Sequence, residues 1–442
     1  MSFDPNFMQP DKTISPMYWM KEKELRGLFD ALQDDLSSLR KQGSSENVES
    51  DSCLRRNDTK EEDSDKPKVL LVGGCVRNTL MGHEVEDIDL ASVHKPEEIQ
   101  KRLERAGYSV IPTGLQHGTI TAVANGKAFE ITTLRHDKET DGRRATVEFT
   151  DDWLEDAKRR DFTINALFMD LEGNVYDPLG QGLKDIEEKN IRFVGKAGQR
   201  IEEDYLRILR FFRFHALYGG QDYDKEGLKA CKAGADKIVN LSRERITQEF
   251  LKILASDNPQ DILDIMFKHN VLKDLDFSKD YPEKDFFRYF CNFQKKYRLS
   301  ALSSRIFVMA GLSRGNMKAL EKYLLLPKVF LKDALALGGA LALRDLSCDS
   351  AVREAVYRFG RSVTAQALMV ELVQDRVMNS YAPVALDIVQ NWDVPDFPVS
   401  GDDILKAGYK KGPEIGERLK ALEDWWIDQD FKPDRACIMN QT

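Results

Sequence analysis

The pattern of apolar and polar residues changes character several times along the chain. Apolar residues recur at helical spacing over residues 17–42, which predicts one amphipathic helix. Residues 44–66 hold few apolar side chains and a net negative charge. Such a segment cannot bury enough surface to offset its ordering entropy, so we expect a mobile acidic insert. The apolar run 68–73 ends in two glycines, which predicts a buried strand, a tight turn and a helix to about residue 82.

Strand and helix signals then alternate. We expect strands at 87–90, 119–123, 127–132, 164–170 and 175–177, and a helix at 96–105. Asn125-Gly126 separates two of these strands and predicts a two-residue hairpin. Glu172-Gly173-Asn174 predicts a second hairpin. The polar, glycine-containing stretch 135–144 is expected to be a loop. After about residue 184 apolar residues recur every three or four positions, so the chain is α+β first and all-α afterwards.

Composition and charge narrow the class of protein. The 442 residues are 42% hydrophobic and 31% charged, as in a globular protein of about three domains. The net charge of −9 argues against attachment to nucleic acid or membrane by overall charge, but leaves room for a local basic track. No run of about 18 apolar residues predicts a membrane span, and the N-terminus lacks the pattern of a secretion signal. The six cysteines form no CxxC pair, which favours a reduced, cytoplasmic compartment.

The glycines at 73 and 74 suggest a phosphate site. A strand that runs through Gly73-Gly74 into a helix leaves bare backbone N–H groups at the helix N-terminus, where an anion binds. Arg77, one turn further on, adds a cationic donor. A plain tight turn has the same pattern, so this motif alone leaves both readings open.

Acidic residues follow on the next predicted strand. Asp87 and Asp89 are two apart, so on a strand their carboxylates point to one face, and such oxygen ligands suit Mg²⁺ together with substrate phosphates. An exposed strand edge is the alternative. Glu130, on a later strand, either joins this site or is a solvated charge.

Two further stretches carry donors for a nucleotide. The sequence RRDFTIN, residues 159–165, offers arginine, aspartate and asparagine side chains, although ordinary polar caps at a helix end would look alike. Asp204 and Arg207 are three apart and are expected to share one face of a helix, which Arg210 and Arg213 continue. A solvated helix face is the alternative here.

In this order and with these gaps, the motifs resemble a known family. GGCVRN, DIDLAS, HGTIT, a DGR loop, RRDFTINAL, DPLG and EDYLRILRFFRF lie between residues 68 and 218. The chain is similar to the class II tRNA nucleotidyltransferases of the DNA polymerase β superfamily, the CCA-adding enzymes, a family that also contains bacterial poly(A) polymerases. EDYLRILRFFRFHA and the closing EDWWI are typical of the alphaproteobacterial form.

The resemblance implies an architecture. The fold is α+β, with a nucleotidyltransferase head that holds a small mixed β-sheet and helices, followed by an all-α neck, body and tail. The implied organisation is an N-terminal helix (1–43), the acidic insert (44–66), the catalytic head (67–183), a base-recognising neck (184–260), a helical body (261–380) and a tRNA-binding tail (381–442).

The resemblance also implies roles. Asp87 and Asp89 would hold two Mg²⁺ ions, and Glu130 would join them as a third catalytic residue. The implied nucleotide-binding residues are Gly73, Gly74, Arg77, Arg160, Asp161, Asn165, Asp204, Arg207, Arg210 and Arg213. Among these, Gly74 and Arg77 would grip the triphosphate, and Asp204 with Arg207 would read the base. Residues 137–144 resemble the loop implicated in the switch from C to A addition, and Asn78 stands where the family usually has Asp.

The expected activity is template-independent addition of C, C and A to tRNA that lacks its 3′ CCA end, from CTP and ATP. Poly(A) polymerase is the rival within the enzyme class, and a catalytically silent RNA-binding helical protein is the rival outside it. Because the protein is acidic overall, we expect tRNA to bind a local basic track that includes Lys410, Lys411 and Lys420. No membrane partner is expected, and the sequence predicts no oligomeric state.

Overall fold

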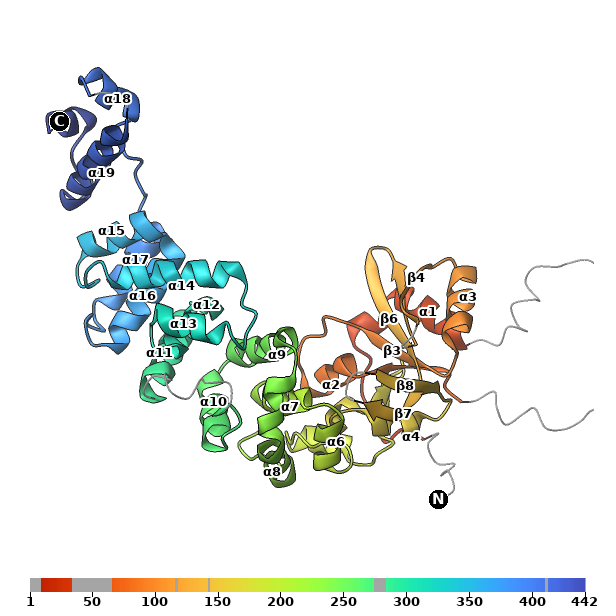
Figure 1. Ribbon diagram of the computed structural model, residues 1–442. Helices are drawn as coiled ribbons and strands as arrows, with labels where there is room; N and C mark the ends of the chain where they lie inside the picture. Colours follow the sequence, from red (N-terminus) through yellow and green to blue (C-terminus); the bar gives the residue numbers. More distant parts are fainter. Residues whose placement is uncertain are drawn as a thin grey trace, which may run out of the picture. The chain divides into compact units, whose positions relative to one another are not determined.

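The computed structural model describes residues 9–33, 66–115, 118–141, 144–273, 284–409 and 412–441 (Figure 1). The chain divides into two compact units, residues 1–235 and 236–442. All of the predicted acidic insert except Lys66 lies outside the described residues. The α+β unit followed by the all-α unit confirms the predicted fold class, whereas the boundaries between neck, body and tail stay predictions.

A mixed sheet forms the centre of the first unit. In the described residues its strand order is β1-β10-β9-β2-β3-β6-β5-β4. The bounds are β1 (Lys12–Thr13), β2 (Val69–Val72), β3 (Asp89–Ser92), β4 (Ser109–Gly114), β5 (Thr119–Ala124), β6 (Lys127–Thr133), β9 (Phe168–Met169) and β10 (Asn174–Tyr176). Within the part of the chain that the structure describes, only β3 and β6 pair in parallel. The predicted hairpin at Asn125-Gly126 is confirmed, because β5 and β6 pair on either side of it.

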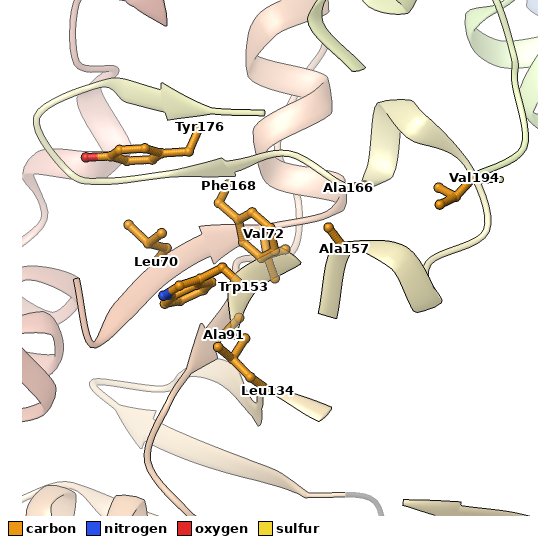
Figure 2. Packing of buried hydrophobic residues seen from close by; sticks show 10 residues of the cluster. All are labelled: Leu70, Val72, Ala91, Leu134, Trp153, Ala157, Ala166, Phe168, Tyr176 and Val194. Carbon is orange, nitrogen blue, oxygen red and sulfur yellow. The ribbon is translucent and has the colours of Figure 1, made fainter. Parts of the chain in front are cut away.

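Strand β2 is buried along its whole length, which explains why it appears in the sequence as an unbroken apolar run. Leu70 and Val72 pack with Trp153 and Phe168 in the cluster of Figure 2. The Trp153 and Phe168 rings meet edge to face, with their centroids 5.0 Å apart. This core fixes the end of β2, where the two glycines lie.

Helices lie beside and after the sheet, and the first three of them contact its strands. In this unit they are α1 (Lys23–Gln33), α2 (Gly74–Met81), α3 (Pro96–Arg105), α4 (Trp153–Arg159), α5 (Gly182–Glu187), α6 (Ala197–Glu203), α7 (Leu206–Tyr218) and α8 (Lys225–Gly234), with 3-10 turns at Tyr18–Lys21 and Thr163–Asn165. The predicted helix at 96–105 coincides with α3. In the described part of the predicted helix 17–42, a 3-10 turn comes first and the α-helix begins only at Lys23.

The N-terminal residues complete the sheet. Strand β1 pairs with β10 at one edge of the sheet, and α1 packs against α3 and β2 through buried leucines such as Leu25, Leu28 and Leu32. The backbone carbonyl of Leu32 lies 2.8 Å from Nε2 of His94. Residues 9–33 are therefore part of this unit.

The expectation of a loop at 135–144 is wrong. Strand β7 (Arg135–Asp141) pairs with β8 (Arg144–Phe149) in a separate two-stranded sheet. The β8 sequence, RATVEF, is rich in residues that favour strands, and pairing with it overrides the polar composition of β7. The side chains of residues 137–147 lie outside the described part.

The second unit is helical throughout its described residues. Its α-helices are α9 (Arg243–Ala255), α10 (Pro259–Lys268), α11 (Lys284–Tyr297), α12 (Leu302–Met309), α13 (Arg314–Leu320), α14 (Lys328–Leu341), α15 (Asp349–Phe359), α16 (Arg361–Val373), α17 (Ala382–Asn391), α18 (Gly401–Lys406), α19 (Pro413–Asp428) and α20 (Arg435–Met439). Buried Arg305 donates to the backbone carbonyls of Leu254 and Ser256, and so closes the C-terminus of α9. Among the helices described, none is both long and apolar enough to cross a membrane.

Candidate active site

The glycine turn lies between β2 and α2. Gly73 has φ +73°, a backbone conformation that favours glycine, and α2 begins at Gly74. A Cβ atom on Gly73 would lie 3.8 Å from Nη1 of Arg160 and 4.0 Å from Oδ2 of Asp89. The structure therefore brings an arginine and an aspartate from distant segments to one bare turn at a helix N-terminus.

The acidic residues meet beside this turn. Asp89 is the first residue of β3 and is paired in register with Glu130 of β6. Burial raises the pKa of Asp89 to about 6, and the neighbouring charges of Glu130 and Asp87 add to the effect. Glu130 is thus an electrostatic neighbour of Asp89, although it is exposed.

The placement of both aspartates on a strand is wrong for Asp87. β3 begins at Asp89, because its pairing with β2 starts at Leu90 and its pairing with β6 starts at Asp89 itself. Asp87 lies in the segment before the strand and is exposed. The two carboxylates remain close enough for Asp87 to raise the pKa of Asp89.

This donor set fits Mg²⁺ bound together with a triphosphate. Within the described residues, no group of three or more His, Cys, Asp or Glu side chains is arranged to hold a metal. Mg²⁺ normally takes one or two protein carboxylates and completes its shell with substrate phosphates and water. Burial, together with the charges of Glu130 and Asp87, raises the pKa of Asp89, and a bound cation would favour its ionised form.

Arg160 is held in place by a buried carboxylate. Its Nε and Nη2 atoms donate to Oδ2 of Asp156 at 3.1 and 2.7 Å, and Arg159 donates to Oδ1 at 2.7 Å. Burial opposes ionisation of Asp156, but the two arginines outweigh it and hold its pKa below the ordinary value. One carboxylate therefore orients two guanidinium groups.

A chain of hydrogen bonds links helix α7 to helix α2. Arg210 donates from Nε and Nη2 to Oδ2 of Asp161 at 2.8 and 2.5 Å. Oδ1 of Asp161 accepts from Nδ2 of Asn165 at 3.0 Å, and Oδ1 of Asn165 accepts from Nη1 of Arg77 at 2.5 Å. Asp161 and Asn165 thus contact the predicted site arginines directly, and Arg77 is largely buried beneath the glycine turn.

The predicted single helix through Asp204 and Arg207 is wrong. Helix α6 ends at Glu203 and α7 begins at Leu206, while Asp204 is extended, with φ −156° and ψ 105°. Oδ1 of Asp204 accepts from the backbone N–H of Leu206 at 3.1 Å. This local bond competes with helical pairing and breaks the helix, so Asp204 and Arg207 do not share a helix face.

Glu203 holds Arg207 instead. Its carboxylate accepts from Nη1 of Arg207 and from Nη1 of Arg200, the latter at 2.9 and 2.7 Å. Nη2 of Arg200 donates to the backbone carbonyl of Arg160 at 2.6 Å, which ties this group to the segment that carries Arg160. Arg213, the last predicted arginine, lies over the Phe214 ring at 4.7 Å.

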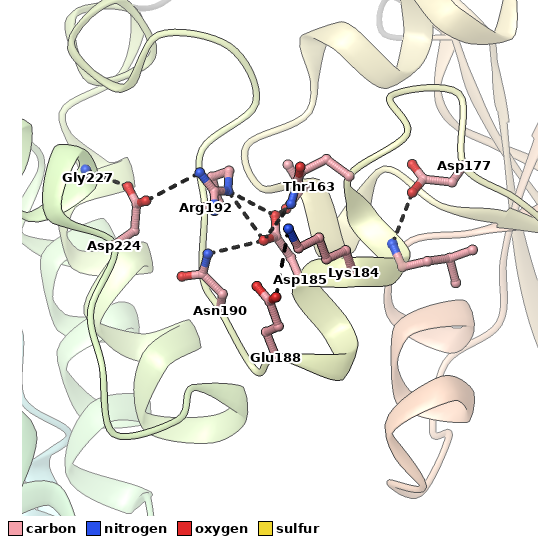
Figure 3. A network of polar contacts seen from close by, with 11 residues as sticks. Thr163, Asp177, Lys184, Asp185, Glu188, Asn190, Arg192, Asp224 and Gly227 are labelled. Atoms are coloured by element: carbon pink, nitrogen blue, oxygen red, sulfur yellow. Dashed lines mark hydrogen bonds and ion pairs between the residues drawn. The ribbon is translucent and has the colours of Figure 1, made fainter.

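A second polar network fixes the segment that carries Asn165. The buried carboxylate of Asp185 accepts from Thr163 at 2.7 Å, from Gln181 and Asn190 at 3.1 Å, and from Arg192 (Figure 3). The Gly180 N–H donates to the Asp177 carbonyl at 2.9 Å, which closes a turn just before α5. This network anchors the 3-10 turn Thr163–Asn165.

Sequence reasoning missed three carboxylates that position the arginines or their segment: Asp156, Asp185 and Glu203. The signal for Asp156 and Glu203 was present, since each lies three or four residues from the arginines it binds within one helix or at its end. Of the partners of Asp185, Gln181 lies four residues earlier, but Thr163 lies in a distant 3-10 turn and Asn190 and Arg192 lie in the segment after α5, so spacing alone would not have found the network.

A nucleoside triphosphate requires a bare glycine turn for its phosphates, neighbouring aspartates for its metal ions, and more arginines than the carboxylates that orient those arginines. On a mixed sheet followed by helices, they define a nucleotidyltransferase, a class that generally uses divalent metals.

Comparison with known proteins narrows this class. The model of the poly A polymerase head domain matches residues 69–192, and that of a probable RNA and SrmB-binding site of polymerase A matches residues 222–275. CCA tRNA nucleotidyltransferase 1, mitochondrial, from Danio rerio is 34% identical over 84% of this chain and 86% of its own length. The CCA-adding enzyme of Streptococcus sanguinis is 32% identical, over 84% and 92% of the two chains.

A solved structure of a CCA-adding enzyme has a similar fold. The Bacillus stearothermophilus CCA-adding enzyme, determined in complex with CTP, aligns with a TM-score of 0.66 and 25% identity over 84% of this chain and 92% of that chain. The chain belongs to the family of CCA-adding enzymes, the tRNA nucleotidyltransferases. The resemblance to the alphaproteobacterial form stays a prediction.

Proposed function

We propose that this protein adds C, C and A in turn to the 3′ end of tRNA that lacks them, from CTP and ATP, without a template and with release of pyrophosphate. The observation that carries the proposal is the convergence of Gly73, Arg160 and Asp89 at one turn, within a chain that is similar to CCA-adding enzymes over most of its length.

The phosphates would bind at the glycine turn. The N–H groups at the start of α2 would donate to a bound phosphate, and Arg160 would supply a charge-assisted donor at the same place. Asp156 fixes the Arg160 guanidinium beforehand, so that little ordering is left to the binding step.

Asp87 and Asp89 would hold two Mg²⁺ ions, and Glu130 would assist from β6. When bound, these ions lower the barrier to attack by the tRNA 3′-hydroxyl and neutralise the departing pyrophosphate. The aspartates themselves would hold these ions in place, while the glycine turn and Arg160 would orient the triphosphate. Asn165 and Asp161 would contribute to ribose and phosphate positioning through the hydrogen bonds that hold Arg77 and Arg210.

The base would be read by Asp204 and Arg207. Cytosine and adenine both present an exocyclic amine beside a ring-nitrogen acceptor, so a carboxylate accepts from the amine and a guanidinium donates to the nitrogen. Uracil and guanine present the reverse order, and leaving these charges unpaired costs on the order of several kcal/mol. Glu203 supports this role because it holds the Arg207 guanidinium in place.

The tRNA would bind by its phosphates to a local basic track. Of the lysines we expect there, Lys410 and Lys411 lie outside the described residues, and Lys420 lies on α19. Affinity for tRNA should fall with rising salt as counterions are released, and an affinity independent of salt would exclude the track. We place the enzyme in the cytoplasm, which fractionation of the source cells tests.

The experiment is to incubate the purified chain with tRNA ending at the discriminator base, with CTP, ATP or both, in Mg²⁺. Two additions with CTP alone and three with both nucleotides support the proposal. A long adenosine ladder would instead identify a poly(A) polymerase, and no extension would leave an RNA-binding protein without catalysis. Asp89→Ala should abolish extension, while Asp222→Asn, an exposed aspartate of the same unit, serves as the matched control.

A further inference from the structure

Arg77 is a buried cation that is held by neutral groups. Its side chain is only 7% exposed. Nε and Nη2 donate to Oδ1 of Asn78 at 3.2 and 2.8 Å, and Nη1 donates to Oδ1 of Asn165. Burying a charge without an opposite charge in contact is costly. The carboxylate of Asp161 attracts Arg77 but is linked to it only through Asn165, so an anion at the turn would offset much of this cost.

Tyr218 completes this set. It is the last residue of α7, and its hydroxyl accepts from Nη2 of Arg77 at 2.9 Å. The guanidinium also lies over the Tyr218 ring, with Cζ 4.2 Å from the centroid, and near the Phe214 ring at 5.2 Å. The tyrosine therefore fixes both the direction of Nη2 and the plane of the guanidinium.

The held atom lies at the phosphate turn. A Cβ atom on Gly74 would lie 3.8 Å from Nη2 of Arg77, the atom that Tyr218 binds. A carboxylate in the place of Tyr218 would orient Nη2 equally well but would cancel its charge. A neutral hydroxyl with an aromatic face orients the group and leaves the positive charge available to an anion at the turn.

We propose that Tyr218 is a positioning residue that holds Arg77 beside Gly74, so that the guanidinium charge acts on the phosphates of the incoming nucleotide. The proposal rests on the proposed function, and it concerns the phosphates that CTP and ATP share. Loss of Tyr218 should therefore weaken both nucleotides equally, unlike a change at the base-reading residues.

The test uses the full chain with Tyr218→Phe, which keeps the ring and removes the hydroxyl, and Tyr218→Leu, which removes both. Tyr223→Phe is the matched control, because Tyr223 follows α7 and stacks on His215 at 3.5 Å rather than on Arg77. CTP addition is measured on tRNA ending at the discriminator base and ATP addition on tRNA ending in CC. Calorimetric titration with inorganic pyrophosphate, which carries no base and needs no turnover, measures binding at the turn.

Tyr218→Phe should raise KM for CTP and for ATP about five-fold, the effect of one net hydrogen bond, with kcat within about two-fold of the unmodified chain. Tyr218→Leu should raise both about thirty-fold, because the ring contact is lost as well. The dissociation constant for pyrophosphate should rise by the same factors, and Tyr223→Phe should leave all three values unchanged.

The proposal is overturned if pyrophosphate binding and both KM values stay within about two-fold in Tyr218→Phe. It is equally overturned if only kcat falls, or if one nucleotide is affected and the other is not. Should Tyr218→Leu fail to fold, Tyr218→Phe decides. Absence of CCA addition by the unmodified chain would refute the proposed function instead, and the pyrophosphate titration would still report on Tyr218.

Discussion

Removal of the Asp185 side chain should destabilise the first unit without touching the nucleotide. Its side chain has 0% exposure and accepts hydrogen bonds from Thr163, Gln181, Asn190 and Arg192. Asp185→Ala leaves all four donors without this partner.

The loss in the free energy of unfolding follows from the donors that Asp185 leaves without a partner. Arg192 is 41% exposed and regains water, so we count nothing for it. The buried Thr163 hydroxyl loses its partner at a cost of about 2 kcal/mol, and the bonds from Gln181 and Asn190 contribute about 1 kcal/mol each. Asp185→Ala should thus destabilise the unit by about 4 kcal/mol. Asp185→Asn retains one acceptor, and the Thr163 hydroxyl can turn to accept from the new amide, so about 1 to 2 kcal/mol is expected.

Differential scanning calorimetry of the full chain provides the measurement. For a unit of this size, about 4 kcal/mol lowers Tm by roughly 8 to 16 °C, and the Asn variant should lose roughly 2 to 8 °C. Lys184→Gln is the control, since the Lys184–Glu188 pair in Figure 3 is exposed and 3.8 Å apart, and it should leave Tm unchanged. A loss below about 3 °C for Asp185→Ala, or equal losses for Ala and Asn, would refute this reasoning.

Three further predictions concern acid stability, base selection and the change from C to A. Burial lowers the pKa of His215 from 6.5 to about 4; the unfolded chain therefore binds more protons between these values, and the first unit should lose about 2 kcal/mol between pH 7 and pH 5. His215→Phe should flatten this part of the curve in urea titrations at several pH values, and an unchanged slope would contradict the assignment. Arg207→Ala should lower kcat/KM for CTP by about 10²-fold and narrow the preference for CTP over UTP, as measured by single-nucleotide incorporation; an equal loss for both nucleotides would argue against base reading. Replacing residues 137–144 by a short Gly-Ser linker should stop the product at CC, and addition of A at the normal rate would show that this segment has no part in the switch.

The sequence alone predicted the secondary structure correctly where local residue types decide it. The apolar run before Gly73 predicted a buried strand, and Asn125-Gly126 predicted a two-residue hairpin, and both are present. The amphipathic pattern at 96–105 gave α3 with its bounds, because a lysine–proline start and a basic last turn define both ends.

Two kinds of feature were beyond the sequence pattern. The strand β7 forms through pairing with a later segment, and its own polar residues carry no sign of it. At the break between α6 and α7, Asp204 is extended and its side chain accepts from the Leu206 N–H, a local bond that competes with a helical pattern otherwise continuous in the sequence. In the site, residue types were enough to nominate Arg77, Arg160 and Asn165, but not Asp156, which orients Arg160.

The early residues that pair with β10 and cover β2 have a practical consequence for protein engineering. A hybrid enzyme cut where the family model begins, at residue 69, would leave β10 as an open edge and uncover the leucine contacts of α1. A catalytic half that is exchanged between relatives should therefore include residues 9–33. An affinity tag fused directly before Lys12 should be separated by a spacer, so that it does not compete with the first strand for its partner.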